Sequence, residues 1–409
     1  MNILYLSQRF GFTTSGIFAD LVRELSQAGH TVTVVTCYPA SFAGKGSSVA
    51  MENGVKILYV QASHLFSHNR MYKGIAQVLL PQIMIKGISA HLDGSRFDLI
   101  LYPTPPITFS GVVNFCKKKY GAQSFLMLKD IFPQNAVDLG IMKEGGFIHR
   151  YFKHVERKLY KVSDYIGCMT NANVDYFKNN NANIPGSRVI LFPNSLDCRN
   201  LKRPVFSVNR VRTTFVFGGN LGLPQDVPLM LSYIKALPAE VPAEFIIIGD
   251  GFYRRSVEDF ILNNPELPVT YIREVPRSQF DDFLDKCDVG LVFLSSKFTV
   301  PNFPARILSY MSRGLPILAM TDDSTDVDGL IELDAICGYW GSSDSGDDFS
   351  KLVTKFCESV SLHKFGQNGQ DFLVNNFDVS DSVKILEHII EPEVHLKESI
   401  LSSKLDTAT

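Results

Sequence analysis

The sequence predicts an α/β protein in which two sheets of parallel strands follow one another along the chain. Short apolar runs alternate with amphipathic helical stretches over most of its length, as in βαβ units. The run Val289–Leu294 is apolar throughout, which is typical of a strand covered on both faces of a parallel sheet. The alternation stops near residue 195 and restarts near residue 213, so the sequence predicts two domains.

Length and composition limit the class of protein. The chain has 409 residues, of which 45% are hydrophobic, so it can bury substantial cores. It contains no uncharged apolar run of about 18 residues, which argues against a membrane-spanning helix. The opening Met1–Leu6 lacks the basic start and cleavage site of a signal peptide and is interpreted as the first strand. The 7 cysteines are scattered without paired C-x-x-C spacing, which favours a reducing compartment, the cytoplasm, and argues against a structural metal.

Charge is distributed unevenly along the chain. Lys and Arg outnumber Asp and Glu in residues 1–200, and the reverse holds in residues 201–409. A basic first half is expected if that half faces an anionic surface. Uneven scatter of solvated charge explains the same pattern equally well, and both interpretations stay open.

The first half predicts a parallel sheet with helical connections. Its expected strands are 2–7, 31–36, 55–60, 97–102, 124–128, 164–170 and 188–192. Its main expected helices are 17–28, 70–92, a helix ending at 117–119, and 147–161. Gly16 precedes the first helix and would let the backbone approach a phosphate, although a single turn glycine is more often structural. The helix 70–92 is interrupted by Pro81 and has wide apolar coverage, so it belongs either to the core or to a lipid-facing strip.

Two charged residues follow the central strand 124–128 directly. Carboxyl ends of parallel strands are where such sheets bind ligands, so Lys129 and Asp130 are candidate functional residues. A mutual ion pair, or Asp130 capping the next turn, is an alternative of comparable weight.

The predicted domain limits follow from the break in the strand pattern. We expect a first domain over 1–195, a linker over 196–212, a second domain over 213–375, a C-terminal helix over 376–391 that crosses back to the first domain, and a polar tail over 392–409. The linker contains the basic, proline-containing tract 199–204, which is typical of a hinge.

The second half repeats the strand, small-residue turn and helix design. Its expected strands are 213–217, 244–248, 269–274, 289–294 and 316–320, and its expected helices include 226–237, 347–362, 364–375 and 379–390. Glycine-rich turns follow the first two strands at Gly218–Gly222 and Gly249–Gly251. Two such turns at the carboxyl ends of consecutive strands point to phosphate binding more strongly than one.

The stretch after Val289–Leu294 predicts a diphosphate-binding site. Asn302 is the expected N-cap of a helix, Pro304 is tolerated in its first turn, and Arg306 adds a fixed positive charge. Backbone N–H groups of such a helix start are expected to face an anion at the sheet edge. The residues alone therefore indicate a two-domain protein that binds a phosphate-bearing ligand in the cleft between its domains.

These stretches together resemble the family 4 retaining glycosyltransferases of the GT-B fold, over nearly the whole chain. The resemblance rests on the spacing and order of several motifs. They are Gly16 to Val34, Asp130-Ile131-Phe132-Pro133 with Val137 to Gly140, Pro193 to Asp197, Gly218 to Gly222, Ile248 to Gly251, and Pro304 to Met311 with Gly314 and Pro316. The Asp130 segment is similar to a loop of bacterial O-antigen and capsule sugar transferases.

The resemblance implies a fold and a reaction. Two Rossmann-like domains would face each other across a cleft, the first binding the acceptor and the second a UDP- or GDP-linked sugar. The implied activity is retaining, metal-independent hexosyl transfer to a polysaccharide or lipid-linked acceptor in surface polysaccharide biosynthesis. No metal and no cofactor other than the donor substrate is expected, since no D-x-D motif stands at a strand end. Nucleic acid is not an expected partner, and the basic first domain is expected to contact the inner face of a membrane peripherally.

The resemblance also assigns candidate residues. Asp130, Lys129 and Arg306 are the expected catalytic group. The expected donor-binding residues are Gly16, Gly218, Gly219, Asn220, Gly249, Asp250, Gly251, Asn302, Phe303, Pro304, Arg306 and Ser309.

The chain departs from the family pattern at several positions. Pro301 and Ser309 stand where the family often has two glutamates, Gln225 is near an expected lysine, and Lys129 replaces a common histidine. These departures motivate one alternative, a catalytically weakened GT-B protein that binds glycan or partners a transferase. A GT-B sugar-nucleotide epimerase is another. A dehydrogenase is disfavoured because the G-x-G-x-x-G fingerprint is missing.

Overall fold

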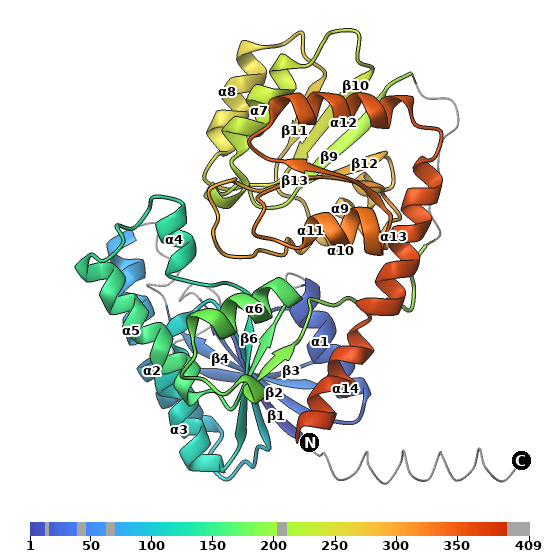
Figure 1. Ribbon diagram of the computed structural model, residues 1–409. Coiled ribbons are helices and arrows are strands. Elements are labelled where there is room, and N and C mark those ends of the chain that lie inside the picture. The colour runs from blue at the N-terminus through green and yellow to red at the C-terminus, as the bar shows by residue number, and fades with distance from the viewer. Residues whose placement is uncertain (13–15, 39–45, 63–69, 203–210, 391–409) are drawn as a thin grey trace, which may run out of the picture.

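The computed structural model describes residues 1–12, 16–38, 46–62, 70–202 and 211–390, with backbone only for 70–75 and 277–278. Two α/β units lie one above the other, and the last two described helices, α13 and α14, run from the upper unit to the lower one (Figure 1). Each unit is a sheet with helices on both faces.

The first sheet has eight described strands in the order β3-β4-β2-β1-β5-β6-β7-β8. Neighbouring strands are parallel except for the β3–β4 pair. Their bounds are β1 Asn2–Leu6, β2 Thr31–Tyr38, β3 Ser48–Glu52, β4 Val55–Gln61, β5 Leu99–Pro103, β6 Gln123–Leu128, β7 Tyr165–Cys168 and β8 Val189–Leu191. The helical segments that connect them are α1 Gly16–Gln27, α2 Arg70–His91, η2 Ile107–Phe109, α3 Ser110–Tyr120, α4 Gln134–Asp138, α5 Phe147–Val162, α6 Asn171–Asn180 and η3 Gly186–Arg188.

The second sheet has six described strands in the order β11-β10-β9-β12-β13-β14, all parallel. Their bounds are β9 Thr213–Gly218, β10 Ala243–Ile248, β11 Val269–Ile272, β12 Val289–Phe293, β13 Ile317–Thr321 and β14 Gly338–Ser342. The remaining helical segments are η4 Leu223–Gln225, α7 Val227–Ala236, α8 Arg254–Asn263, α9 Arg277–Leu284, α10 Arg306–Ser312, α11 Val327–Gly329, η5 Leu330–Asp334, α12 Gly346–Glu358, α13 Leu362–Asn376 and α14 Val379–Ile390.

Burial of the central strands explains their continuous apolar sequence. Every residue of β5, β12 and β13 is buried, because helices cover both faces of the two sheets. The α/β class predicted from the sequence is therefore confirmed. The sequence analysis missed β3 and β14, which lie at the outer edges of their sheets, where one neighbour strand is absent and less apolar side chains suffice.

Helix α2 is continuous, although an interruption at Pro81 was expected. The proline lies inside the helix, and the residues around it pack into the first core at Ala76, Leu80, Met84 and Ile88. This packing supports the core interpretation for these four side chains, whereas Val78 and Leu79 on the same helix are 47% and 49% exposed. Packing against the sheet compensates for the backbone hydrogen bond that a proline removes.

The C-terminal helix α14 packs on the first sheet. Val383 and Leu386 belong to the same apolar cluster as Ile3 and Leu21, and α1 lies beside α14. A backbone bridge between Leu196 and Asp378 ties the start of this helix to the end of the first half. The predicted domain limits remain predictions, and linker residues 203–210 and the expected tail 392–409 lie outside the described residues. Within the described residues, none of the helices combines the length and apolar character needed to traverse a bilayer.

Candidate functional site

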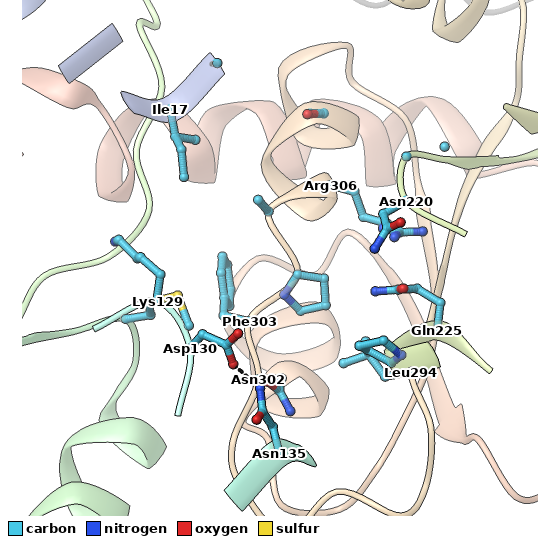
Figure 2. A pocket seen from close by; sticks show the side chains of 18 of the residues that line it. Ile17, Lys129, Asp130, Asn135, Asn220, Gln225, Leu294, Asn302, Phe303 and Arg306 are labelled. Carbon is cyan, nitrogen blue, oxygen red and sulfur yellow. Dashed lines mark hydrogen bonds between the residues drawn. The ribbon is translucent and has the colours of Figure 1, made fainter. Parts of the chain in front are cut away.

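A cavity of about 500 Å³ lies between the carboxyl edges of the two sheets. Its wall on the first-sheet side includes Gly16, Lys129 and Asp130, and its opposite wall includes Gly219 and Arg306. Figure 2 shows Lys129, Asp130 and Asn135 across the cavity from Arg306, Asn220 and Gln225, with Phe303 and Asn302 between them. Both halves of the chain therefore contribute to one site.

Arg306 is the cation of the second-sheet wall. Its guanidinium group lies over the ring of Phe217, with the central carbon 4.3 Å from the ring centroid. The Nη1 atom is buried and has no hydrogen-bond partner among the described residues. Burial lowers the pKa of Arg306 from its ordinary value, but an arginine stays charged in proteins. A buried, unsatisfied charge is costly, so this geometry is typical of a site completed by an anion.

The backbone beside Arg306 is shaped for a close approach. Gly219 has a φ of +115°, a conformation that other residues rarely adopt, and a Cβ atom there would lie 3.7 Å from Nη2 of Arg306. Tyr310 fixes the same region from beneath. Its hydroxyl accepts a hydrogen bond from the Gly218 N–H at 3.0 Å and lies 3.1 Å from the Val216 carbonyl oxygen.

The glycine turn Gly218–Gly222 uses most of its backbone donors internally. The amides of Gly219 and Leu221 donate to the carbonyls of Ile248 and Asp250, and the Gly222 amide donates to Oε1 of Gln225. Most of these N–H groups therefore donate to acceptors inside the protein and are not free to bind a phosphate as the sequence had suggested. The guanidinium of Arg306 is the positively charged group of this wall among the described lining residues.

Helix α10 begins at Arg306 rather than at Asn302, so the predicted N-cap is wrong. Its N-cap is Ala305, and the Asn302 side chain donates to the Val300 carbonyl instead. The Asn302 carbonyl accepts a hydrogen bond from Thr325 Oγ1 at 2.7 Å, which holds this residue outside the helix. Because α10 has only 7 residues, its dipole contributes less to anion binding than the sequence suggested.

The segment before α10 is used to join the two halves. Phe298 and Val300 are buried in the apolar cluster of the first sheet. Nδ2 of Asn173, on α6, donates to the Pro301 carbonyl at 2.8 Å. The Thr299 amide donates to the Asp138 carboxylate at 2.8 Å. These contacts explain why 298–302 is irregular, and they bring the start of α10 to the cavity.

The second glycine turn supports the site from behind. Gly249, Asp250 and Gly251 were predicted to bind the donor, but they do not line this cavity. Gly249 has a φ of +148°, and a Cβ there would lie 1.8 Å from the Gly219 carbonyl oxygen. This turn therefore packs against the first one and sets its position.

Lys129 and Asp130 are held at the end of β6 by Thr104. The Thr104 hydroxyl oxygen accepts hydrogen bonds from both of their backbone amides, at 3.0 and 3.2 Å. Asp130 accepts a hydrogen bond from the Asn135 side chain, and Nζ of Lys129 lies 3.4 Å from the Phe192 carbonyl. Among the described ion pairs none joins Lys129 to Asp130, so the expected alternative of a mutual pair does not hold.

Burial shifts the protonation of both side chains toward neutrality. It lowers the pKa of Lys129 to about 7, and it raises the pKa of Asp130 to about 6. Paired groups with shifted pKa values in a cleft are typical of functional sites. Near neutral pH this wall can donate or accept a proton or bind a polar ligand.

The structure brings together most of the predicted site. The predicted residues that line the cavity are Gly16, Lys129, Asp130, Gly218, Gly219, Asn220, Asn302, Phe303, Pro304, Arg306 and Ser309. The sequence analysis did not identify Ile17, Asn135, Met169, Leu196, Pro224, Phe280, Leu294, Phe298 and Ala305 as lining residues. Asn135 was detectable, because it lies five residues after Asp130 in a recognised loop. Phe280 was not, because helix α9 was not predicted.

The described residues hold no cluster of three or more His, Cys, Asp or Glu side chains of the kind that binds a metal ion. The cavity offers a partly buried cation on one wall and two titratable groups on the other. This arrangement can bind an anionic group beside Arg306 while a second polar group meets Lys129 and Asp130.

Comparison with known proteins finds similarity to glycosyltransferases. No family model matches the chain. A probable glycosyltransferase of Pseudomonas aeruginosa, WbjE, is 24% identical over 324 residues, which cover 72% of this chain and 79% of that protein.

Solved structures resemble the whole chain. One is the E. coli structure described as trehalose-6-phosphate bound with UDP-2-fluoro glucose. Its chain matches with a TM-score of 0.72 at 11% identity, over 95% of this chain and 99% of that one. WaaG, a glycosyltransferase involved in lipopolysaccharide biosynthesis, matches with a TM-score of 0.60 at 14% identity, over 95% and 99% of the two chains. At these identities the likeness establishes the fold. The chain has the GT-B architecture of two Rossmann-like domains, as the resemblance implied.

Proposed function

We propose that this chain is a glycosyltransferase that moves a sugar from a UDP- or GDP-linked donor to a polysaccharide or lipid-linked acceptor in surface polysaccharide biosynthesis. The observation that carries the proposal is the buried, unpartnered Nη1 of Arg306 in the wall of the cavity between the two domains. The relative WbjE, the neighbour WaaG and the UDP-sugar bound to the E. coli protein support the reaction class, the pathway and the donor.

The proposed role of Arg306 is to bind the departing nucleoside diphosphate. When the sugar–phosphate bond breaks, negative charge grows on the diphosphate oxygens, and a fixed guanidinium stabilises that charge without reorganising. A charge-assisted hydrogen bond of this kind contributes roughly 1.5–3 kcal/mol. The ring of Phe217 packs against the guanidinium, so little conformational entropy is lost when the donor binds.

The proposed role of the opposite wall is to orient the sugar and the acceptor. Asp130 accepts a hydrogen bond from a sugar or acceptor hydroxyl, and Lys129 donates to an oxygen of the same ligand. Asn135 holds the Asp130 carboxylate in its position. Closure of the two domains over the cavity would exclude water and limit hydrolysis of the donor.

We also propose retention of configuration and independence from a bound metal ion. In this scheme the acceptor hydroxyl attacks the face of the sugar that the diphosphate leaves, so the reaction needs no protein nucleophile. No D-x-D motif stands at the end of a strand, which supports metal independence; the triplet Asp326-Val327-Asp328 lies at the start of α11 instead. Measurement of the anomeric configuration of the product tests the first proposal, and full activity in the presence of a chelator tests the second.

The test of the function is donor-dependent product formation by the purified protein. A panel of UDP- and GDP-sugars is incubated with lipid-linked and polysaccharide acceptors, and the wild-type chain is compared with Arg306→Ala and Arg306→Lys. We expect kcat/KM to fall by about 100- to 1,000-fold in Arg306→Ala, with partial activity in Arg306→Lys. Loss of less than about tenfold would remove the diphosphate role from Arg306.

A catalytically weakened, glycan-binding protein is the second candidate. Ser309 is a neutral side chain in the cavity wall at a position where the resembled family often has a glutamate. This candidate predicts donor or glycan binding without turnover for any donor and acceptor in the panel. Formation of a glycosylated product would dismiss it.

A further inference from the structure

Residues 298–302 belong to the second half of the chain but pack into the first half. They lie in the irregular connection between β12 and α10. Phe298 and Val300 are 5% and 0% exposed, and both are members of the apolar cluster of the first sheet. Thr299, between them, is exposed, which is the alternation of a segment laid against another surface. The second half therefore inserts two side chains into the core of the first.

Hydrogen bonds from two helices of the first half hold this segment. Nδ2 of Asn173 on α6 donates to the Pro301 carbonyl at 2.8 Å in a buried contact. Oδ1 of the same amide lies 3.3 Å from the hydroxyl of Thr170, which donates to it, so both ends of the Asn173 side chain are used. The amide and the hydroxyl of Thr299 donate to the carboxylate of Asp138 on α4, at 2.8 and 3.0 Å. Loss of the Asn173 donor would leave a buried carbonyl oxygen without its partner.

These contacts are separated from the other connection between the halves. Helix α4 lies on the left of the molecule, whereas α13 and α14 run down its right side (Figure 1). The backbone amide of Ala172, at the start of α6, adds a contact to the Asp326 carboxylate of the second half at 3.1 Å. Rotation of one half about the α13–α14 connection would have to withdraw Phe298 and Val300 from the first core.

The segment leads directly into the cavity wall. Phe298 and Asn302 line the cavity, and α10 begins at Arg306, four residues after Asn302. Figure 2 shows Asn302 and Phe303 between the two walls. The place where residues 298–302 sit on the first half therefore determines where the start of α10 lies.

The contact is small enough to release. Phe298 and Val300 are the residues of this segment that join the first core, and the Asn173 bond is its buried hydrogen bond. Helix α14, on the other side, buries Val379, Val383 and Leu386 against the first half. Regions with fewer buried apolar contacts open at lower free energy than regions with more. The segment is thus the side expected to open, and α14 is the side expected to act as the hinge.

We propose that residues 298–302 form a latch whose seating in the first half closes the cavity, and that Asn173 is the positioning residue that holds it there. When the latch is seated, Arg306 faces Lys129 and Asp130 across the cavity (Figure 2). When it is released, the two halves separate and the cavity opens for ligand entry and exit. Every contact of the latch is made by protein groups, so its seating needs no bound nucleotide.

The test compares two buried asparagines. Asn173→Asp keeps the size of the side chain, but an ionised carboxylate cannot donate to the Pro301 carbonyl. The matched control is Asn264→Asp in the second half, because Asn264 is 7% exposed and its Nδ2 donates to the Phe260 carbonyl within α8 at 2.6 Å. Both variants lose a bond from a side-chain amide to a backbone carbonyl, and only the first bond belongs to the latch.

Small-angle X-ray scattering and calorimetric titration with UDP and GDP give the readouts. The wild type should keep its radius of gyration when nucleotide is added. Asn173→Asp should be more extended without nucleotide and return to the wild-type value with it. Its nucleotide affinity should fall about tenfold, because the closed form is then only fractionally populated. Asn264→Asp should match the wild type in both measurements.

A milder variant keeps the test decisive if Asn173→Asp does not fold. Thr299→Val removes the hydroxyl that donates to Asp138 and retains the shape of the side chain and the buried Asn173 bond. It should shift the scattering and the nucleotide affinity in the same direction by a smaller factor.

The kinetic readout rests on the proposed function. In Asn173→Asp the KM for the donor should rise about tenfold while kcat stays within about twofold, because fewer molecules are closed before binding and the closed complex is unchanged. A merely structural role would reduce the amount of folded protein, which lowers the apparent kcat without raising KM.

Two results would overturn the latch. One is Asn173→Asp with the same scattering and nucleotide affinity as Asn264→Asp. The other is a wild type that becomes more compact when nucleotide binds, which would show that the segment seats only with ligand. A wild type that binds neither nucleotide, together with an extended Asn173→Asp, would remove the proposed function and still support the latch.

Discussion

A single arginine connects the sequence to the proposed chemistry. Arg306 follows a buried strand, begins α10 and enters the cavity with a buried nitrogen that no described group satisfies. Proteins rarely retain such a charge for stability, because its desolvation destabilises the fold unless a partner completes the site. The desolvated charge is therefore expected to lower the free energy of unfolding of the unliganded protein by a measurable amount.

Replacing Arg306 by methionine should stabilise the unliganded protein slightly or leave it unchanged. Methionine keeps much of the packing against Phe217 and removes the desolvated charge. We expect a change in unfolding free energy between zero and about +1 kcal/mol from denaturant unfolding of the ligand-free protein. A loss of more than about 1 kcal/mol would show that Arg306 is mainly a structural residue.

Lys129 should make stability depend on pH. Its pKa is lowered to about 7 in the folded protein, so between about pH 7 and its ordinary value of 10.5 the unfolded chain binds more protons than the folded chain. Stability therefore rises with pH in this window, and the destabilisation is fully present below about pH 7. In urea unfolding, the free energy of unfolding of the wild type should rise relative to that of Lys129→Met as pH increases from neutral to about 9. A stability difference between the two proteins that does not vary with pH would contradict the lowered pKa of Lys129.

At the residue scale, the sequence predicted which side chains gather but not how each is held. Lys129, Asp130 and Arg306 were identifiable because charges directly after buried strands lie at a sheet edge. Asn302 was assigned as a helix cap because its type and position fit one. The structure instead uses its backbone to contact Thr325, a partner more than twenty residues away that no local pattern reveals.

At the element scale, the two glycine turns form one unit. The turn after β10 packs so closely on the turn after β9 that a side chain at Gly249 would overlap the Gly219 carbonyl. The position of Gly219, and through it the position of Arg306, therefore depends on residues outside the cavity.

Gly249→Ala should be strongly destabilising. The new Cβ would lie 1.8 Å from the Gly219 oxygen, so the turns must separate. We expect a loss of about 2 kcal/mol or more in unfolding free energy, together with weaker nucleotide binding. The control is Gly54→Ala, which also has a positive φ but meets no atom within 4 Å and should cost about 1 kcal/mol. Equal losses in the two variants would refute the packing argument.

Elements were predictable where local pattern and burial agree. The central strands are apolar because both of their faces are buried, and they appear within a residue or two of their expected positions. The edge strand β14 contains Gly338, Tyr339 and Trp340 and lacks such a run. The N-cap of helix α10 lies three residues later than expected, because contacts with the first half hold the preceding segment in an irregular conformation.

At the scale of the whole molecule, α14, the last described helix, packs on the first sheet. Val379, Val383 and Leu386 are buried against the first half, although α13 immediately before them packs on the second. The hydroxyls of Ser195 and Ser382 are 2.8 Å apart in the same contact. The helix therefore helps to set how the two walls of the cavity face each other.

Leu386→Ala should destabilise the first unit and loosen its connection to the second. Removing a fully buried leucine side chain costs about 2–5 kcal/mol, and Leu386 is completely buried. Limited proteolysis should cut the variant faster than the wild type at the end of α13. The matched control is Lys384→Ala on the exposed face of the same helix, which should behave like the wild type. Similar proteolysis of both variants would show that α14 contributes little to the assembly.

The most direct test of the central claim is calorimetric titration with nucleoside diphosphates and with the corresponding nucleosides. The claim is that Arg306 binds the diphosphate of a sugar nucleotide in the cavity between the domains. It predicts that UDP or GDP binds the wild type at least about tenfold more tightly than its nucleoside, and that this margin disappears in Arg306→Met while nucleoside affinity is retained. The same margin in both proteins, or no binding of either diphosphate, would contradict the account.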